Sequence, residues 1–119
     1  MLILHLEYSD FFRRVLKDMI IQSGHSVIES KKGGDIFKLL AQNPVDMIIT
    51  GLELSDMLGE EVIEELNESQ FGDLPIVVIT GLDIIDLKER IKGLKINDFI
   101  LKQDLDLHSF QRVVDRLLP

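Results

Sequence analysis

The sequence predicts an α/β domain in which helices cover both faces of a doubly wound parallel sheet. Five short apolar runs alternate along the chain with five segments of helical spacing, and the connections between them are short. Such alternation is typical of a parallel sheet with right-handed crossovers. The chain has 119 residues, of which 45% are hydrophobic and 29% are charged. This length and composition indicate a single folded domain over residues 1–119.

The predicted strands are short runs that are bounded by turn residues. The cores of two of them, 47–49 and 76–79, contain only apolar residues, so we expect these strands to be buried on both faces of the sheet. The run 26–30 is more polar and is expected nearer the edge of the sheet. The other predicted strands are 1–6 and 98–101.

Capping and stop residues mark the predicted helices. Ser9 is expected to cap the first helix, which Gly24 stops, and Asp83 to cap the fourth. The second helix spans 35–42 and ends before Pro44, because the residue before a proline disfavours helix. The third covers 60–68, the fourth carries Ile84, Leu87 and Ile91, and the last has Leu107, Phe110, Val114 and Leu117 on one face behind Asp104 or Asp106.

The composition excludes several classes of function. The net charge of −8 disfavours direct binding to nucleic acid or to anionic lipid, which both need basic patches. The absence of cysteine excludes disulfides, thiol catalysis and cysteine-based zinc sites, and it fits a reducing compartment. The apolar run 1–6 is too short for a signal peptide or a membrane span. We therefore expect a cytoplasmic protein.

The residues at the predicted strand ends carry a family resemblance. Asp46 precedes the strand 47–49, Gly51 follows it, and the next loop ends at Gly59. In this layout the chain resembles, over residues 1–118, the receiver domain of two-component response regulators. The resemblance implies a flavodoxin-like fold with strand order 2-1-3-4-5. The positions that match the receiver's phosphorylation site and its switch aromatic are Glu7, Gly51, Thr80, Lys102 and Phe99.

The departures from the receiver pattern concern chemistry. Gly51 stands where a receiver has its phosphoacceptor aspartate, and Glu7 is the only carboxylate where a receiver has two. Phosphoryl transfer needs a nucleophilic oxygen and a cation, so we expect no transfer to position 51 and weak or absent Mg²⁺ binding. Lys102 is expected to pair with Glu7. Gln103 replaces the family's proline, so we expect a trans Lys102–Gln103 bond.

We therefore interpret the chain as a pseudo-receiver, a protein-interaction module of two-component signal transduction with no enzymatic activity of its own. Its partner is then a signalling protein or an attached output domain. Because the chain stops at residues 118–119, directly after the last predicted helix, a further interpretation is that it is one domain cut from a longer multidomain protein. Two alternatives stay open. One is phosphorylation on a displaced carboxylate, Glu53 or Asp56, and the other is binding of a small ligand in the same cleft.

Receivers often dimerise through the fourth helix, fifth strand and fifth helix, and a homodimer of that kind is a further interpretation. It rests on four charged residues that resemble the ion pairs of that contact: Asp86, Lys88, Asp98 and Arg112. Exposed charges of both signs are also ordinary on any surface.

Three other features have simpler interpretations. His5 lies in an apolar strand and is expected to be partly buried, neutral and hydrogen-bonded once. The segment 33–37 resembles a diguanylate cyclase signature, but we interpret it as two glycines leading into a helix capped by Asp35. The acidic residues of 60–68, with Glu53 and Asp56, predict a solvated acidic face, or a docking face for a basic partner.

Overall fold

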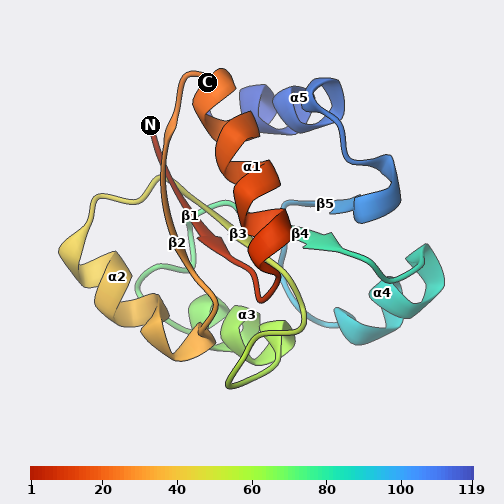
Figure 1. Cartoon of the computed structure of the whole chain (residues 1–119). Helices are drawn as coiled ribbons and strands as arrows, with labels where there is room; N and C mark the ends of the chain where they lie inside the picture. The colour runs from red at the N-terminus through yellow and green to blue at the C-terminus, as the bar shows by residue number, and fades with distance from the viewer.

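Five parallel strands form one sheet in the order β2-β1-β3-β4-β5 (Figure 1). This order confirms the predicted strand order and the edge position of β2. The computed structural model describes residues 1–119. The strands are β1 (Leu2–Leu6), β2 (Ser26–Ser30), β3 (Met47–Thr50), β4 (Ile76–Thr80) and β5 (Asp98–Leu101).

Five α-helices cover the two faces of this sheet. Helices α1 and α5 lie on one face, and α2, α3 and α4 lie on the other (Figure 1). None of the helices is long and apolar enough to cross a membrane. The helices are α1 (Asp10–Gln22), α2 (Ile36–Gln42), α3 (Gly59–Asn67), α4 (Ile84–Arg90) and α5 (Leu107–Leu117).

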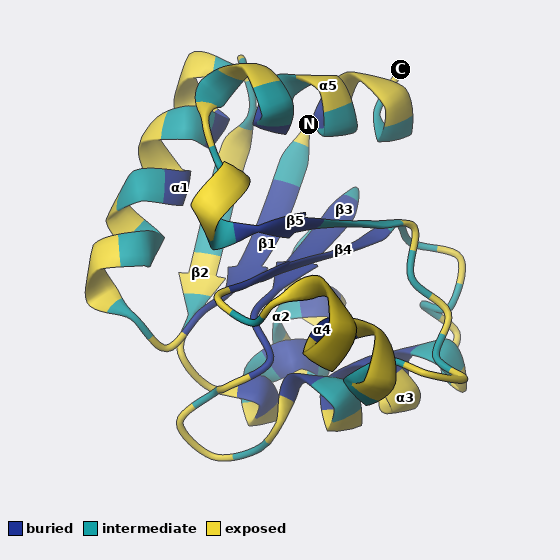
Figure 2. Ribbon diagram, turned by 90° about the vertical axis from the view of Figure 1, so that its right-hand side faces the viewer, coloured by how far each residue is buried: buried dark blue, intermediate teal, exposed yellow.

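Alternation along the strands builds two hydrophobic cores. On β1, Leu4 points toward α2 and α3, whereas its neighbour Ile3 points toward α1 and α5. All residues of β3 and β4 are buried, so these strands appear uniformly dark in Figure 2. This burial on both faces explains why their sequences are apolar without interruption. Polar residues are therefore left to the ends of the strands, where the candidate site lies.

Three of the predicted helix caps are present and one is wrong. The Ser9 hydroxyl and the carboxylates of Asp83 and Asp106 accept backbone N–H groups at the starts of α1, α4 and α5. Asp35 makes no such cap. Residues Gly33–Asp35 form a 3₁₀ turn before α2, and the Asp35 carboxylate accepts the Ser30 hydroxyl instead.

The turn packs closely against α3 at Gly33. A Cβ at this position would lie 2.6 Å from Cγ2 of Val62 on α3 and 2.7 Å from Cγ of Met57. The close packing of the turn against α3 therefore requires a glycine.

The expectation for His5 is also wrong in part. The side chain is 1% exposed, so it is fully buried rather than partly buried, and its Nδ1 has no hydrogen-bond partner. Burial lowers the pKa of His5 from 6.5 to about 3, and the positive charges of Lys102 and Arg13 lower it further. The imidazole is therefore neutral at physiological pH, as expected.

Candidate functional site at the strand ends

The carboxyl ends of four strands meet around a small hollow. Glu7 follows β1, Gly51 follows β3, Thr80 ends β4 and Lys102 follows β5. The hollow has a volume of about 60 Å³, and Leu52, Glu53, Ile79 and Gly81 complete its lining. The structure thus brings together the four residues that sequence reasoning placed at this edge of the sheet.

Glu7 and Lys102 form the expected ion pair at the centre of the hollow. Lys102 Nζ lies 2.9 Å from Glu7 Oε1, and the Ser9 backbone N–H donates to Glu7 Oε2 over 2.9 Å. The Glu7 side chain is only 6% exposed. Lys102 Nζ also lies 3.9 Å from the ring centroid of Phe12, within the range of a cation–π contact. Both oxygens of the buried carboxylate are therefore engaged within the chain.

The peptide bond between Lys102 and Gln103 is trans, since the chain contains no cis peptide bond. This prediction is confirmed. Thr80, which is 5% exposed, accepts the Leu82 backbone N–H through its hydroxyl oxygen over 3.2 Å. The threonine thus fixes the loop that leaves β4.

Gly51 occupies a position where the backbone can carry a side chain. Its φ is not positive, and a Cβ would lie 3.5 Å from Glu7 Oε1 and 3.7 Å from the Ile79 carbonyl oxygen, which are ordinary contacts. Gly59 is different, because a Cβ there would come within 2.8 Å of the Leu52 Cα. The fold therefore requires glycine at 59 but does not require it at 51.

Glu53, one of the two carboxylates considered as displaced acceptors, is held by Arg90 of α4. Arg90 Nη1 donates to Glu53 over 2.6 Å, and Nε and Nη2 donate to the two oxygens of Glu60 over 2.7 and 2.8 Å. These hydrogen bonds, those to Glu60 first, raise the pKa of Arg90 above its usual value despite the opposing effect of desolvation. One guanidinium thus joins α4 to α3 and to the loop after β3.

Asp56, the other candidate acceptor, is engaged on the side of α2. Its carboxylate accepts the backbone N–H groups of Gly33 and Gly34 over 2.8 and 2.9 Å. Desolvation acts to raise the pKa of Asp56, but these backbone donors, with Lys32 nearby, hold it below its usual value. The glycines that resembled a cyclase signature therefore serve as an anchor for the loop after β3.

The predicted acidic face on α3 is smaller than expected. Glu60 is paired with Arg90, and Glu61 accepts the Leu58 backbone N–H at the start of the helix. Glu64, Glu65 and Glu68 are exposed and make no ion pair within the chain.

Sequence reasoning missed Arg90 and Phe12 as parts of this region. Arg90 is separated from Glu53 by 37 residues and from Glu60 by 30. Its only local signal was a basic residue in the last turn of a helix, which is common. Phe12 follows Ser9 by three residues in a run of helical spacing, and that spacing does not indicate a lysine above its ring.

Phe99 and the four charged residues of the candidate dimer surface lie elsewhere. Phe99 lines two grooves along β5, of about 300 and 390 Å³, on the sides of α4 and α5. Asp98 is already paired within the chain with Arg116. Asp86, Lys88 and Arg112 are exposed and form no ion pair within the chain.

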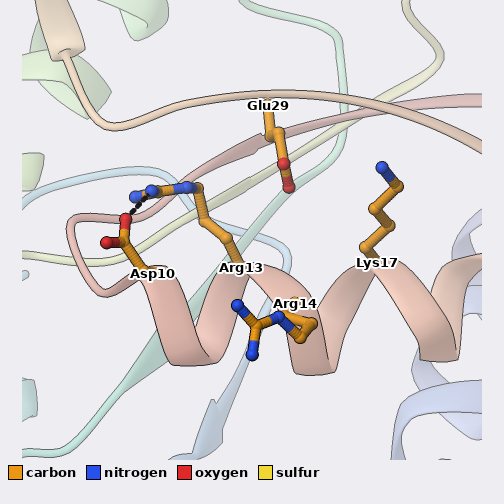
Figure 3. A pocket seen from close by; sticks show the side chains of 5 residues that line it. All are labelled: Asp10, Arg13, Arg14, Lys17 and Glu29. Atoms are coloured by element: carbon orange, nitrogen blue, oxygen red, sulfur yellow. Dashed lines mark hydrogen bonds and ion pairs between the residues drawn. The ribbon is translucent and has the colours of Figure 1, made fainter.

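A further cleft of about 340 Å³ lies between α1 and β2 and is lined only by charged residues (Figure 3). Arg13 reaches Asp10 in an ion pair, and it also donates to the backbone carbonyls of Glu7 and Tyr8. The remaining lining residues are Arg14, Lys17 and Glu29. Because Arg13 and Asp10 are already paired, two basic groups and one acidic group remain in this cleft, which gives it only a small excess of positive charge.

Comparison with known proteins agrees with this architecture. The model of the response regulator receiver domain family matches residues 3–112. The chain is a receiver domain of the response regulator family. The polar-differentiation response regulator DivK of Brucella ovis is 23% identical over 88 residues, which are 73% of this receiver domain and 72% of DivK.

Solved structures show that the fold of this receiver domain is shared. A response regulator from Chloroflexus aurantiacus has a TM-score of 0.88 at 19% identity and covers 99% of this chain and 98% of its own. The receiver domain of the sensor histidine kinase PA1611 from Pseudomonas aeruginosa, solved with a magnesium ion in its active site cleft, has a TM-score of 0.88 at 20% identity. It covers 98% of this chain and 95% of its own.

Proposed function

We propose that this receiver domain is not phosphorylated at its strand ends and acts as a protein-interaction module in two-component signal transduction. The observation that carries the proposal is Gly51. It supplies no nucleophilic oxygen at the end of β3, although the backbone there has room for a side chain. Without an acceptor oxygen, a phosphoryl group has no atom to which it can be transferred.

The donor set supports weak or absent Mg²⁺ binding. Glu7 is the one buried carboxylate in the hollow, and its two oxygens are engaged by Lys102 and the Ser9 backbone N–H. Nowhere in the chain do three residues among His, Cys, Asp and Glu converge as a metal site. Because Mg²⁺ needs an octahedral set of oxygen ligands, a carboxylate that is paired with an ammonium group is a poor anchor for it.

The contacts of Glu53 and Asp56 argue against the displaced-acceptor alternative. Arg90 binds Glu53, and two backbone N–H groups hold Asp56 toward α2. The small-ligand alternative is disfavoured by size, because a hollow of about 60 Å³ is far below the roughly 300 to 1,000 Å³ of ligand pockets. In this proposal the domain works by contact with partners and not as an enzyme.

The partner surface that we favour is the face of α4, β5 and α5, in a homodimer or against an output domain. Ile85 is 76% exposed on α4, and the charged residues Asp86, Lys88 and Arg112 are free to pair with a second chain. Asp98 contributes less, because Arg116 already binds it. Analytical ultracentrifugation of the parent and of Arg112→Glu tests this surface. A parent that stays monomeric at high concentration would count against the homodimer.

Intact-mass spectrometry after incubation with acetyl phosphate and Mg²⁺ tests the main proposal. We expect no mass gain in the parent domain, whereas an active receiver run in parallel gains one phosphate. NMR spectra recorded with beryllofluoride and Mg²⁺ should likewise show no shifts in the loops after β1, β3 and β4. A phosphate gain that disappears in Glu53→Gln or Asp56→Asn would overturn the proposal in favour of a displaced acceptor.

A further inference from the structure

Helix α4 is weakly anchored by hydrophobic contact. Leu87 is the only buried residue among the seven of the helix, and Figure 2 shows most of α4 as exposed. Ile84 and Ile85, at its start, are 37% and 76% exposed. Ile91, directly after the helix, is partly buried against the same core. Because helices in proteins are held mainly by burial of an apolar face, one buried leucine and one partly buried isoleucine give α4 a small hydrophobic attachment.

Arg90 supplies a second attachment at the end of α4. Its guanidinium binds both oxygens of Glu60 on α3 and one oxygen of Glu53 in the loop after β3. The side chains of Arg90 and Glu60 are only 25% and 20% exposed. A bidentate pair that is partly shielded from water is stronger than an ordinary surface ion pair. Arg90 therefore adds a polar attachment to the apolar contacts that hold α4 in place.

The segment that carries α4 is bounded at both ends. Before it, the Thr80 hydroxyl holds the Leu82 backbone N–H. After it, Gly93 has a φ of +81°, a conformation that favours glycine. Beyond Gly93 the chain is fixed independently of Arg90, since the Asn67 side chain accepts the Lys95 N–H and donates to the Lys95 carbonyl over 2.8 and 3.1 Å. If α4 moves, the chain after Gly93 can therefore stay in place.

We propose that Arg90 is a releasable clamp, and that its release lets the segment 83–92 open as one unit while the sheet stays folded. Opening moves Ile84 and Ile85 relative to β5 and frees Glu53 at the rim of the strand-end hollow. Such a two-state element changes the surface that a partner contacts and needs no phosphoryl group. The clamp does not depend on whether the domain is phosphorylated.

Hydrogen exchange of the full chain, measured by NMR or mass spectrometry, tests the clamp through Arg90→Met, which keeps the aliphatic stem. We expect α4 amides to exchange about tenfold to a hundredfold faster, with β3 and β4 amides changed less, because a charge-assisted pair limits local opening. Arg116→Met is the matched control, since it removes another inter-element ion pair and should leave α4 exchange unchanged. Unchanged α4 exchange in Arg90→Met, or equal acceleration of all core amides, would overturn the proposal.

Glu60→Gln gives an independent test that leaves Arg90 in place. It should accelerate α4 exchange, though less than Arg90→Met, because Arg90 keeps its contact with Glu53. The double variant should exchange little faster than Arg90→Met alone, because that substitution already removes the pair with Glu60. Glu64→Gln, one turn along α3 and without an ion pair, is its control. Strictly additive effects of the two substitutions would show that Arg90 and Glu60 act separately and would exclude the clamp.

Discussion

Replacement of His5 by leucine should make the domain more resistant to acid. The imidazole is 1% exposed, its Nδ1 has no partner, and its pKa is lowered from 6.5 to about 3 by burial and then by Lys102 and Arg13. In the unfolded chain the histidine takes up a proton as the pH falls through 6.5, whereas in the folded chain it stays neutral until about pH 3. The folded state therefore loses stability as the pH falls between these two values.

The size of this loss of stability follows from the difference between the pKa values of His5 in the unfolded and folded states. Each unit of pH between the two pKa values contributes about 1.4 kcal/mol, so acidification from the unfolded-state pKa by about 2 units lowers the free energy of unfolding by about 3 kcal/mol. His5→Leu removes this loss, because leucine does not titrate. It also removes the unpaired buried Nδ1, which should stabilise the fold at neutral pH by about 1 kcal/mol.

Urea unfolding followed by circular dichroism at neutral pH and at about pH 4.5 measures the effect. The carboxylates titrate in both proteins, so the informative quantity is the difference between variant and parent. We expect that difference to grow by about 3 kcal/mol on acidification. His108→Gln, which removes an exposed histidine, should lose the same free energy as the parent. Equal losses in His5→Leu and the parent would mean that His5 is not buried and neutral, and the reasoning would fail.

Four further substitutions test the strand-end region. Glu7→Gln should destabilise the domain by about 2 kcal/mol in thermal unfolding, because it leaves Lys102 without its counter-charge; an unchanged melting temperature would contradict this. Gly59→Ala should cost about 2 kcal/mol or more by overpacking, whereas Gly51→Ala should cost less than about 1 kcal/mol, so equal losses would refute the reasoning about space. Asp56→Ala should speed hydrogen exchange at the Gly33–Asp35 turn, and unchanged exchange there would show that the carboxylate does not hold it.

The sequence predicted the fold well because its main signals are local. The boundaries of β2 and β5 agree with the predicted ranges, and turn or capping residues flank each of these strands. The start of α2 was misjudged by one residue and its cap was assigned wrongly. That error has a cause that is distant in the sequence, since the turn at Gly33 packs against Val62 and Met57, which follow the next strand along the chain.

The sequence predicted those residues of the candidate site whose positions depend only on the order of the strands. Glu7, Gly51, Thr80 and Lys102 end four neighbouring parallel strands, so the sheet itself brings them together. The partner of Arg90 could not be predicted, because a guanidinium on a helix end can reach many carboxylates and only packing selects among them. The full burial of His5 likewise depends on the helices that cover β1.

The charged groups around Gly51 have partners within the chain. A lysine at 20% exposure without a counter-charge would be costly, and Glu7 reaches it at 2.9 Å. Glu53 and Asp56 are likewise paired, with Arg90 and with two backbone donors. Because each of these charges is satisfied within the chain, an incoming phosphate or metal would have to break existing pairs. Contacts with partners are therefore best sought on surfaces whose charges and apolar groups remain unpaired, as on α4.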